Sequence, residues 1–184
     1  GILGPTGMTA WIGLFEIGLP KTGETVVVSA AGGAVGTVVG QLAKAEGCRV
    51  IGLTSTPDKA RWLEREVGYD RVIDRETEAD LDNALRNACP DGVDIFFDNV
   101  GGEALDTVMS QLREQARLVL CGAISQYESA VQPLHNSWEL ITKRARMEGF
   151  MFSDYFECFP RIADDLLTRL QEGALVSFDA VYEG

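Results

Sequence analysis

Short runs of β-branched and aromatic residues alternate along this chain with longer stretches whose apolar residues recur at helical spacing. Several of the short runs are apolar on both faces, which is typical of strands buried within a parallel sheet. The pattern predicts strands at residues 25–29, 49–53, 71–74, 93–99, 117–121 and 146–152. It predicts helices before the turn at residues 20–24, after the first strand, and at residues 60–67, 79–88, 103–112 and 154–172.

Alternation of strands and helices with short turns produces βαβ units, which build an open parallel sheet covered by helices on both faces. We therefore expect an α/β fold with a doubly wound, six-stranded parallel sheet. If the chain binds a dinucleotide, the strand order should be 3-2-1-4-5-6. The length of 184 residues suits one domain, and the sequence contains no repeat, linker or low-complexity tract.

The charge balance argues against two broad classes of partner. The chain has 16 Lys and Arg against 28 Asp and Glu, which gives a formal net charge of -12. Binding to nucleic acid or to an anionic membrane depends on basic surface, so we expect neither partner. No apolar run approaches the ~20 residues that a membrane-spanning helix needs.

The cysteines and the single histidine limit the available chemistry. Cys48, Cys89, Cys121 and Cys158 are widely spaced without a C-x-x-C pair, which favours reduced thiols in a cytoplasmic protein. Because His135 is the only histidine, we expect neither a histidine-rich metal site nor a His-based triad. We predict no metal site, and any catalysis should depend on a cofactor or on other side chains.

A glycine-rich turn follows the first predicted strand. Residues 30–36 read AAGGAVG, which is the dinucleotide-binding fingerprint with Ala31 at its first glycine position. Gly33 has no Cβ, so the backbone can approach a pyrophosphate closely, and the next helix offers N–H groups and a positive dipole end. Gly36 allows close packing of that helix on the strand. The alternative is a tight glycine turn that binds no ligand.

The end of the second predicted strand indicates which dinucleotide fits. NAD-selective domains carry an acidic residue there, about 20 residues after the glycines, to bind the ribose hydroxyls. This chain instead has hydroxyl residues such as Ser55 and no carboxylate before Asp58. Lys59, Arg61 and Arg75 supply positive charge near the place of a 2′-phosphate, which favours NADP(H). For Lys59 a solvated helix position is the alternative, and for Arg61 it is the preferred interpretation.

Several motifs together resemble a known enzyme group: GILGPTGMTAW, SAAGGAVGTVVGQLAKAEGCRVIGLT, DKARWL, VDIFFDNVGG and LVLCGAISQY. They are similar to the medium-chain dehydrogenase/reductase superfamily. Within it they resemble the zinc-free, NADPH-dependent alkenal/one oxidoreductases, such as the prostaglandin reductases, leukotriene hydroxydehydrogenases and curcumin reductases. The resemblance covers nearly the whole chain in order, and DNVGG combined with CGAIS-x-Y is more specific than the glycine turn.

The resemblance implies that an α,β-unsaturated aldehyde or ketone is the small-molecule substrate. Hydride from NADPH would add to the β-carbon, and the enolate would then be protonated at the α-carbon. The implied cofactor-binding residues are Gly33, Ala34, Val35 and Gly36 at the pyrophosphate, Ser55, Lys59 and Arg75 toward the 2′-phosphate, Asn99, Cys121, Gly122, Ala123, Ile124, Ser125 and Tyr127 around the nicotinamide and its ribose, and Phe150, Met151 and Phe152 nearby.

Tyr127 is the expected catalytic side chain, since its hydroxyl could donate a hydrogen bond to the cofactor ribose or to the developing enolate. A packing role for Tyr127 and a turn-amide role for Asn99 are the alternatives. Cys121 should contribute its backbone rather than its thiol. The chain departs from the family pattern with Ser55 for a usual Gly, Arg75 for a frequent Tyr, and Glu128 for a usual Asn.

Other enzyme classes fit less well or remain open. Short-chain dehydrogenases need Y-x-x-x-K, and no tyrosine of this chain has a lysine four residues later. A quinone reductase of the same superfamily, and a cofactor-binding module without turnover, are both open. Relatives have a separate N-terminal barrel-like domain, which nothing in residues 1–184 resembles. We therefore expect residues 1–184 to be the NADP(H)-binding Rossmann domain of a longer, homodimeric enzyme.

Overall fold

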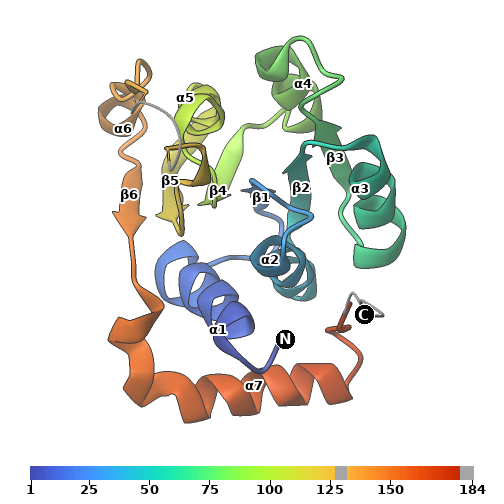
Figure 1. The fold of residues 1–184 in the computed structure, drawn as a ribbon. Helices are drawn as coiled ribbons and strands as arrows, with labels where there is room; N and C mark the ends of the chain where they lie inside the picture. Colours follow the sequence, from blue (N-terminus) through green and yellow to red (C-terminus); the bar gives the residue numbers. More distant parts are fainter. Residues whose placement is uncertain (127–131, 179–184) are drawn as a thin grey trace.

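A parallel sheet forms the centre of the computed structural model, which describes residues 1–126 and 132–178. Six strands stand in the order β3-β2-β1-β4-β5-β6, which confirms the predicted fold class and strand order (Figure 1). The strands are β1 (Thr25–Val28), β2 (Arg49–Thr54), β3 (Arg71–Asp74), β4 (Val93–Asp98), β5 (Leu112–Leu120) and β6 (Arg146–Gly149). The order reverses between β1 and β4, and ligands of open α/β sheets bind in the crevice at such a point.

Helices cover both faces of this sheet (Figure 1). One face carries α1 (Pro5–Ile12), α2 (Ala34–Ala45), α3 (Pro57–Trp62) and α7 (Phe159–Gln171), and the other carries α4 (Leu81–Ala88), α5 (Gly102–Met109) and α6 (Glu139–Thr142). Short helical turns complete the fold: η1 (Gly13–Gly18), η2 (Leu63–Val67), η3 (Ile124–Gln126) and η4 (Phe152–Cys158). In the described part of the chain, no helix has both the length and the apolar character needed to cross a membrane.

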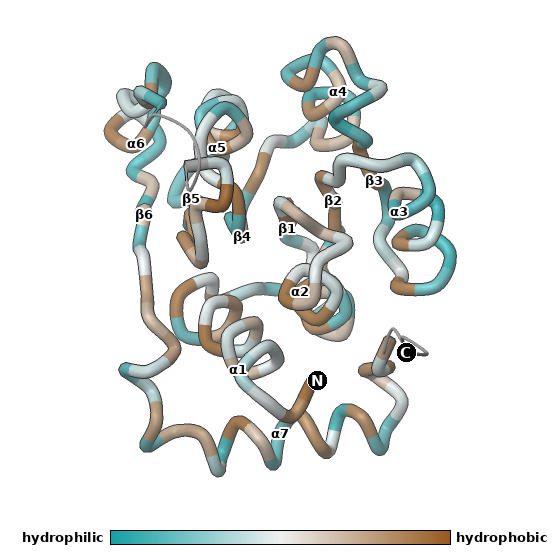
Figure 2. Tube along the Cα trace, in the orientation of Figure 1, coloured by the Kyte–Doolittle hydropathy of each residue, from teal (hydrophilic) through white to brown (hydrophobic). Residues whose placement is uncertain are grey.

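The apolar runs fit this arrangement because successive strand side chains point to opposite faces. In β1, Val26 and Val28 join the hydrophobic cluster under α1 and α2, whereas Val27 joins the cluster under α4 and α5. All residues of β1 and β4 are buried. In Figure 2 the central strands are largely hydrophobic, whereas α3 and α4 carry hydrophilic outer turns.

Helix starts follow local capping rules. Thr56 is the N-cap of α3 and Pro57 occupies its first turn, where a missing N–H costs nothing. Asp80 caps α4, since its carboxylate accepts a hydrogen bond of 3.0 Å from the Asn83 N–H. The predicted helices at 60–67 and 79–88 are therefore present; the Asp80 side chain caps the second, whereas the Thr56 side chain makes no capping hydrogen bond at the start of α3.

Some predicted boundaries are wrong. The helix predicted at 103–112 ends at Met109, and its last predicted residue, Leu112, instead begins β5, because buried Leu112 pairs with Val93 in the sheet. The strand predicted to begin at residue 117 therefore starts five residues earlier. Residues 150–152 lie beyond β6, which ends at Gly149. The last helix begins at Phe159, and the preceding residues form the 3-10 turn η4, in which Tyr155 has non-helical angles (φ -113°, ψ 18°).

Candidate functional site

Two cavities open where the strands of the described chain end. The first has a volume of about 330 Å³, and its lining comes from the ends of β1, β2 and β3, the start of α3 and the turn after β4. The second, of about 680 Å³, is lined by the segments that follow β4, β5 and β6. The cavities thus lie on the two sides of the point where the strand order reverses, as expected for the two halves of a dinucleotide.

The glycine turn joins β1 to α2 below the first cavity. Gly33 is the N-cap of α2, and none of the described side chains caps this helix end. The first N–H groups of α2 are thus available to an anion. Ala30 adopts a left-handed conformation with φ of 47°, and its carbonyl accepts a 2.9 Å hydrogen bond from the Gly33 N–H. A Cβ at Gly36 would lie 2.6 Å from the Ala30 carbonyl oxygen, so only glycine fits there.

A buried tyrosine that the sequence reasoning missed supports this turn. The Tyr69 hydroxyl donates a 2.7 Å hydrogen bond to the Gly36 carbonyl. Its ring occupies space left by two glycines, because a Cβ at Gly40 or Gly52 would lie 2.3 Å or 3.0 Å from ring atoms. Burial raises the pKa of Tyr69, which keeps the hydroxyl protonated and able to donate. The side chain therefore fixes the first turn of α2 relative to β2.

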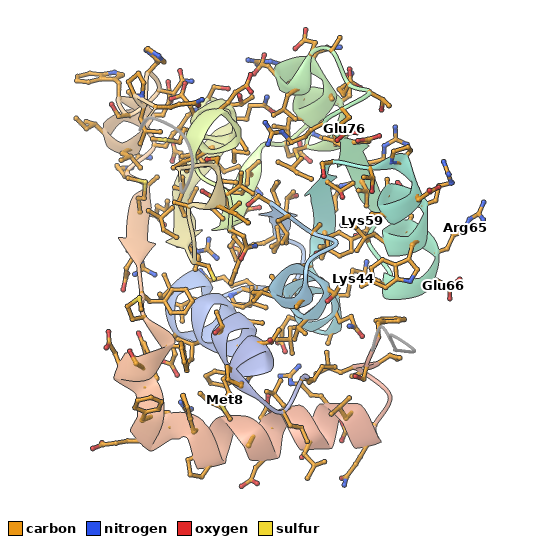
Figure 3. All side chains as sticks on the ribbon, viewed as in Figure 1. Met8, Lys44, Lys59, Arg65, Glu66 and Glu76 are labelled. Atoms are coloured by element: carbon orange, nitrogen blue, oxygen red, sulfur yellow. The ribbon has the colours of Figure 1, made fainter. Side chains whose placement is uncertain are left out.

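Lys59, Arg75 and Ser55 all line the first cavity. The Lys59 stem reaches from α3 across the glycine turn, where a Cβ at Gly32 would lie 3.0 Å from Lys59 Cδ (Figure 3). The Arg75 guanidinium is 3.4 Å from a carboxylate oxygen of Glu103. The structure therefore brings two cations and a hydroxyl together at the ends of β2 and β3.

Arg61 lies apart from this group. Its guanidinium pairs with the Asp58 carboxylate one helical turn back, and both side chains are exposed. The pair agrees with the preferred interpretation of Arg61 as a solvated helix residue.

Asn99 directly follows β4, between Asp98, which lines the second cavity, and Val100, which lines the first. Its side-chain amide donates a 2.8 Å hydrogen bond to the Ser29 carbonyl, and its backbone N–H donates to the Ser29 hydroxyl at 2.8 Å. Ser29 lines the first cavity and Asp98 lines the second, and the sequence reasoning did not single out either residue. Ser29 directly follows the buried strand β1, and Asp98 is the last residue of the buried strand β4. This position at a strand end is the one sequence signal that indicates them.

The segment after β5 divides between the cavities. Cys121, Gly122 and Ala123 line the second cavity, whereas Ile124 lines the first. Burial, with a smaller effect of the Asp98 charge, raises the pKa of the Cys121 thiol to about 11, so the thiol is protonated at neutral pH.

The following residues hold the turn after β4. The Ser125 hydroxyl donates a 2.6 Å hydrogen bond to the Val100 carbonyl. Tyr127, the expected catalytic residue, lies outside the described residues.

The predicted aromatic segment after β6 is only partly at the site. Phe150 and Met151 line the second cavity. The Phe152 ring instead stacks on Phe159 with centroids 6.1 Å apart and an interplanar angle of 8°. Met8, on α1, packs against the hydrophobic cluster on that face (Figure 3).

Metal ligands are not grouped in the described part of the chain. No cluster of three or more His, Cys, Asp or Glu residues there could hold a metal ion.

Comparisons with known proteins identify the family of this chain. The family model described as zinc-binding dehydrogenase matches residues 34–169. The chain is 44% identical over its full length to (+)-pulegone reductase from Mentha piperita and 44% identical to the NADP(+)-dependent 2-alkenal reductase from Nicotiana tabacum, and it covers 54% of each.

A solved structure is similar over nearly the whole chain. The NADPH complex of CurA from Vibrio vulnificus superposes with a TM-score of 0.89 and 40% identity, over 96% of this chain and 54% of CurA. The chain thus spans about half the length of the relatives that it matches. It belongs to the zinc-binding dehydrogenase family, within the medium-chain dehydrogenase/reductase superfamily and alongside the alkenal and enone reductases that its motifs resemble.

Proposed function

We propose that this chain is the NADP(H)-binding part of an oxidoreductase that reduces the C=C bond of α,β-unsaturated aldehydes and ketones. The observation that carries the proposal is the placement of Lys59 and Arg75 together in the first cavity, at the ends of β2 and β3. An NAD-selective site would have a carboxylate at the end of β2. Here β2 ends at Thr54 and is followed by Ser55.

The residues present fit the parts of NADP(H) in order along the sheet edge. Gly33 would admit the diphosphate to the first turn of α2, where N–H groups and the helix dipole favour negative charge. Lys59 and Arg75 would bind the 2′-phosphate. The second cavity, which Cys121 and Phe150 help to line, would accept the nicotinamide half. When bound, NADPH supplies the hydride for the reaction.

Electrostatics support the choice of a phosphorylated dinucleotide. The chain carries a formal charge of -12, so an anionic ligand is repelled by most of the surface. At the first cavity, two cations beside a helix N-terminus instead attract an anionic ligand. Arg75 already pairs with Glu103, whose side chain is 75% exposed, so its guanidinium is oriented without being neutralised in a buried pair.

The chemical role of the remaining predicted residues stays a prediction. Tyr127 would donate a hydrogen bond to the cofactor ribose or to the enolate oxygen, and Asn99 would contact the cofactor from the switch point. Ala34, Val35 and Gly36 would surround the diphosphate, and the residues from Gly122 to Ser125 would border the nicotinamide ribose. The Phe152 ring stacks on Phe159, and its contact with the cofactor also remains a prediction.

Besides this chain, the whole protein would include a barrel-like N-terminal domain that closes over the nicotinamide and forms most of the substrate pocket. The assay that tests the function uses the full-length protein with NADPH and either a 2-alkenal or a quinone. We expect consumption of NADPH with the alkenal to be much faster. Consumption of NADPH with quinones alone would favour the second candidate function, an NADPH:quinone reductase. Consumption with neither substrate would indicate a cofactor-binding module without turnover.

A second copy of the protein is also part of the proposal. The edge strand β6 is exposed along its whole length, and the nearby side chains of Trp138 and Ile141 are 66% and 65% exposed. Free strand edges and apolar patches favour pairing with another chain. Light scattering on the full-length protein should give twice the mass of one chain, and the Ile141→Glu variant should give a lower mass. A wild-type protein with the mass of one chain would contradict the proposed dimer.

The proposal places the protein in the cytoplasm and gives zinc no part in the reaction. Cys48, Cys89, Cys121 and Cys158 are all free thiols, which suits a reducing compartment. Zinc independence follows from the resemblance to the zinc-free reductases. Dialysis against a chelator should leave alkenal reduction unchanged, and loss of activity that zinc restores would contradict this.

A further inference from the structure

Asp98, the last residue of β4, is fully buried and accepts hydrogen bonds from several loops at once. Its carboxylate accepts from the Ser29 hydroxyl at 2.7 Å, from the Val100 N–H at 3.0 Å and from the Gly101 N–H at 3.0 Å. Its backbone carbonyl accepts from the Cys121 N–H at 2.8 Å. One residue therefore joins the ends of β1, β4 and β5.

The turn after Asp98 has a backbone shape that needs such support. Gly101 and Gly102 have φ angles of 71° and 61°, in the region that favours glycine. The carboxylate accepts the N–H groups of the two residues before Gly102, so the turn wraps around it. Ser29, held by the same carboxylate, in turn accepts the Asn99 N–H at 2.8 Å.

Both cavities depend on this network. Ser29 and Val100 line the first cavity, and Asp98 and Gly101 line the second, so the carboxylate lies in the wall between them. The pKa of Asp98 is raised above its usual range because the carboxyl is buried, and the hydrogen bonds from Ser29, Val100 and Gly101 offset only part of that rise. A buried negative charge offers no direct attraction to an anionic dinucleotide, so any benefit to binding must come through geometry.

We propose that Asp98 is a positioning residue for the cofactor, whose carboxylate holds Ser29 and the 99–102 turn in the arrangement that both halves of NADP(H) require. The inference rests on the proposed function. It assigns to Asp98 a contribution to binding that does not depend on the 2′-phosphate, because the network touches the walls of both cavities.

The same strand offers a matched control. Asp94 is also buried, and its carboxylate accepts from the Thr25 N–H at 2.8 Å and from Arg113 at 3.2 Å. Like Asp98 it links β4 to β1, but it lies near the amino end of the strand, away from both cavities. Asp94→Asn therefore measures what loss of a buried carboxylate does to the fold alone.

The experiment compares wild type, Asp98→Asn, Ser29→Ala and Asp94→Asn by titration with NADPH and NADH and by denaturant unfolding. In Asp98→Asn the amide oxygen can take the place of Oδ1, which accepts from Ser29, Val100 and Gly101, but the acceptor loses its charge and an NH₂ group faces the second Gly101 contact. Because hydrogen bonds to a charged acceptor are about twice as strong as those to a neutral one, Asp98→Asn should weaken binding of both dinucleotides about three- to tenfold and leave their ratio unchanged. Ser29→Ala should show a smaller loss in the same direction. Asp94→Asn should lose stability but keep its NADPH affinity within about twofold of wild type.

The results distinguish a failure of the role assigned to Asp98 from a failure of the proposed function. Wild-type affinity in both Asp98→Asn and Ser29→Ala, or an equal loss of affinity in Asp94→Asn, overturns the positioning role. If Asp98→Asn does not fold, Ser29→Ala decides by itself, because it removes one hydroxyl and leaves the carboxylate in place. A wild type that binds neither dinucleotide overturns the proposed function and this role together.

Discussion

Replacement of Lys59 with alanine should weaken NADPH binding by about ten- to a hundredfold and leave NADH binding within about twofold of wild type. The Lys59 stem crosses Gly32 in the first cavity, which brings its ammonium group toward the site proposed for the 2′-phosphate. NADH lacks that phosphate, so it cannot lose the same charge-assisted hydrogen bond. Titration by nicotinamide fluorescence measures both affinities on one sample.

Lys44 provides the control for the change in net charge. It lies near the carboxyl end of α2 and pairs with Asp70 at 2.8 Å (Figure 3). Lys44→Ala removes the same charge but should leave both affinities near wild type at physiological ionic strength. An equal loss of NADPH and NADH affinity in Lys59→Ala, or a loss in Lys44→Ala as large as in Lys59→Ala, would refute the assigned role of Lys59.

Gly36→Ala should abolish measurable dinucleotide binding and lower the free energy of unfolding by about 2–3 kcal/mol. The added Cβ would lie 2.6 Å from the Ala30 carbonyl oxygen and 2.7 Å from that of Ala31, and backbone atoms have little freedom to move away. The first turn of α2 would be pushed off β1, which also disturbs the hydrogen bond from Tyr69 to the Gly36 carbonyl. Denaturant unfolding and NADPH titration measure the two effects.

The Gly33→Ala variant distinguishes the role of Gly33 from that of Gly36. Gly33 has φ of -85° and ψ of 170°, which alanine adopts readily, and its Cβ would approach only the Ala30 oxygen, at 3.1 Å. We expect a smaller loss of stability than in Gly36→Ala, with strongly weakened binding because the methyl group meets the diphosphate. If Gly33→Ala binds NADPH normally, the diphosphate does not lie where the fingerprint predicts.

The strands could be predicted because their evidence is local, and their order then followed from the dinucleotide-binding fold that the glycine turn indicates. The runs that form β1 and β4 are apolar on both faces, and only a sheet with both faces covered buries such runs. Thr56 and Pro57 likewise predict a helix start from their own chemistry. The glycine turn could likewise be recognised from the strand before it and the helix after it, and in the structure it lines the first cavity.

The misplaced boundaries have tertiary causes. Leu112 continues the apolar spacing of α5 but is buried by pairing with Val93 in the sheet. The early part of β5 contains Gln115 with φ of 61°, where the register shifts, and no sequence rule marks that position. Phe152 reads as strand because it is apolar, whereas its ring belongs to an aromatic cluster around η4.

The supporting residues of the site could not be predicted for a related reason. Ser29 and Asp98 are 69 positions apart, and their hydrogen bond exists only because β1 and β4 are neighbours. Tyr69 fills a gap made by two glycines on different elements, so its role depends on three distant positions. Residues that bind a ligand are therefore easier to recognise in a sequence than the residues that support them.

The central claim is that this chain binds NADP(H) through the 2′-phosphate. Titration of purified residues 1–184 with NADPH and with NADH, under identical conditions, tests it most directly. We predict that NADPH binds at least about tenfold more tightly, because only NADPH presents a phosphate to Lys59 and Arg75, and that added salt narrows the difference. Equal affinities for the two dinucleotides, or binding of neither, would contradict the claim.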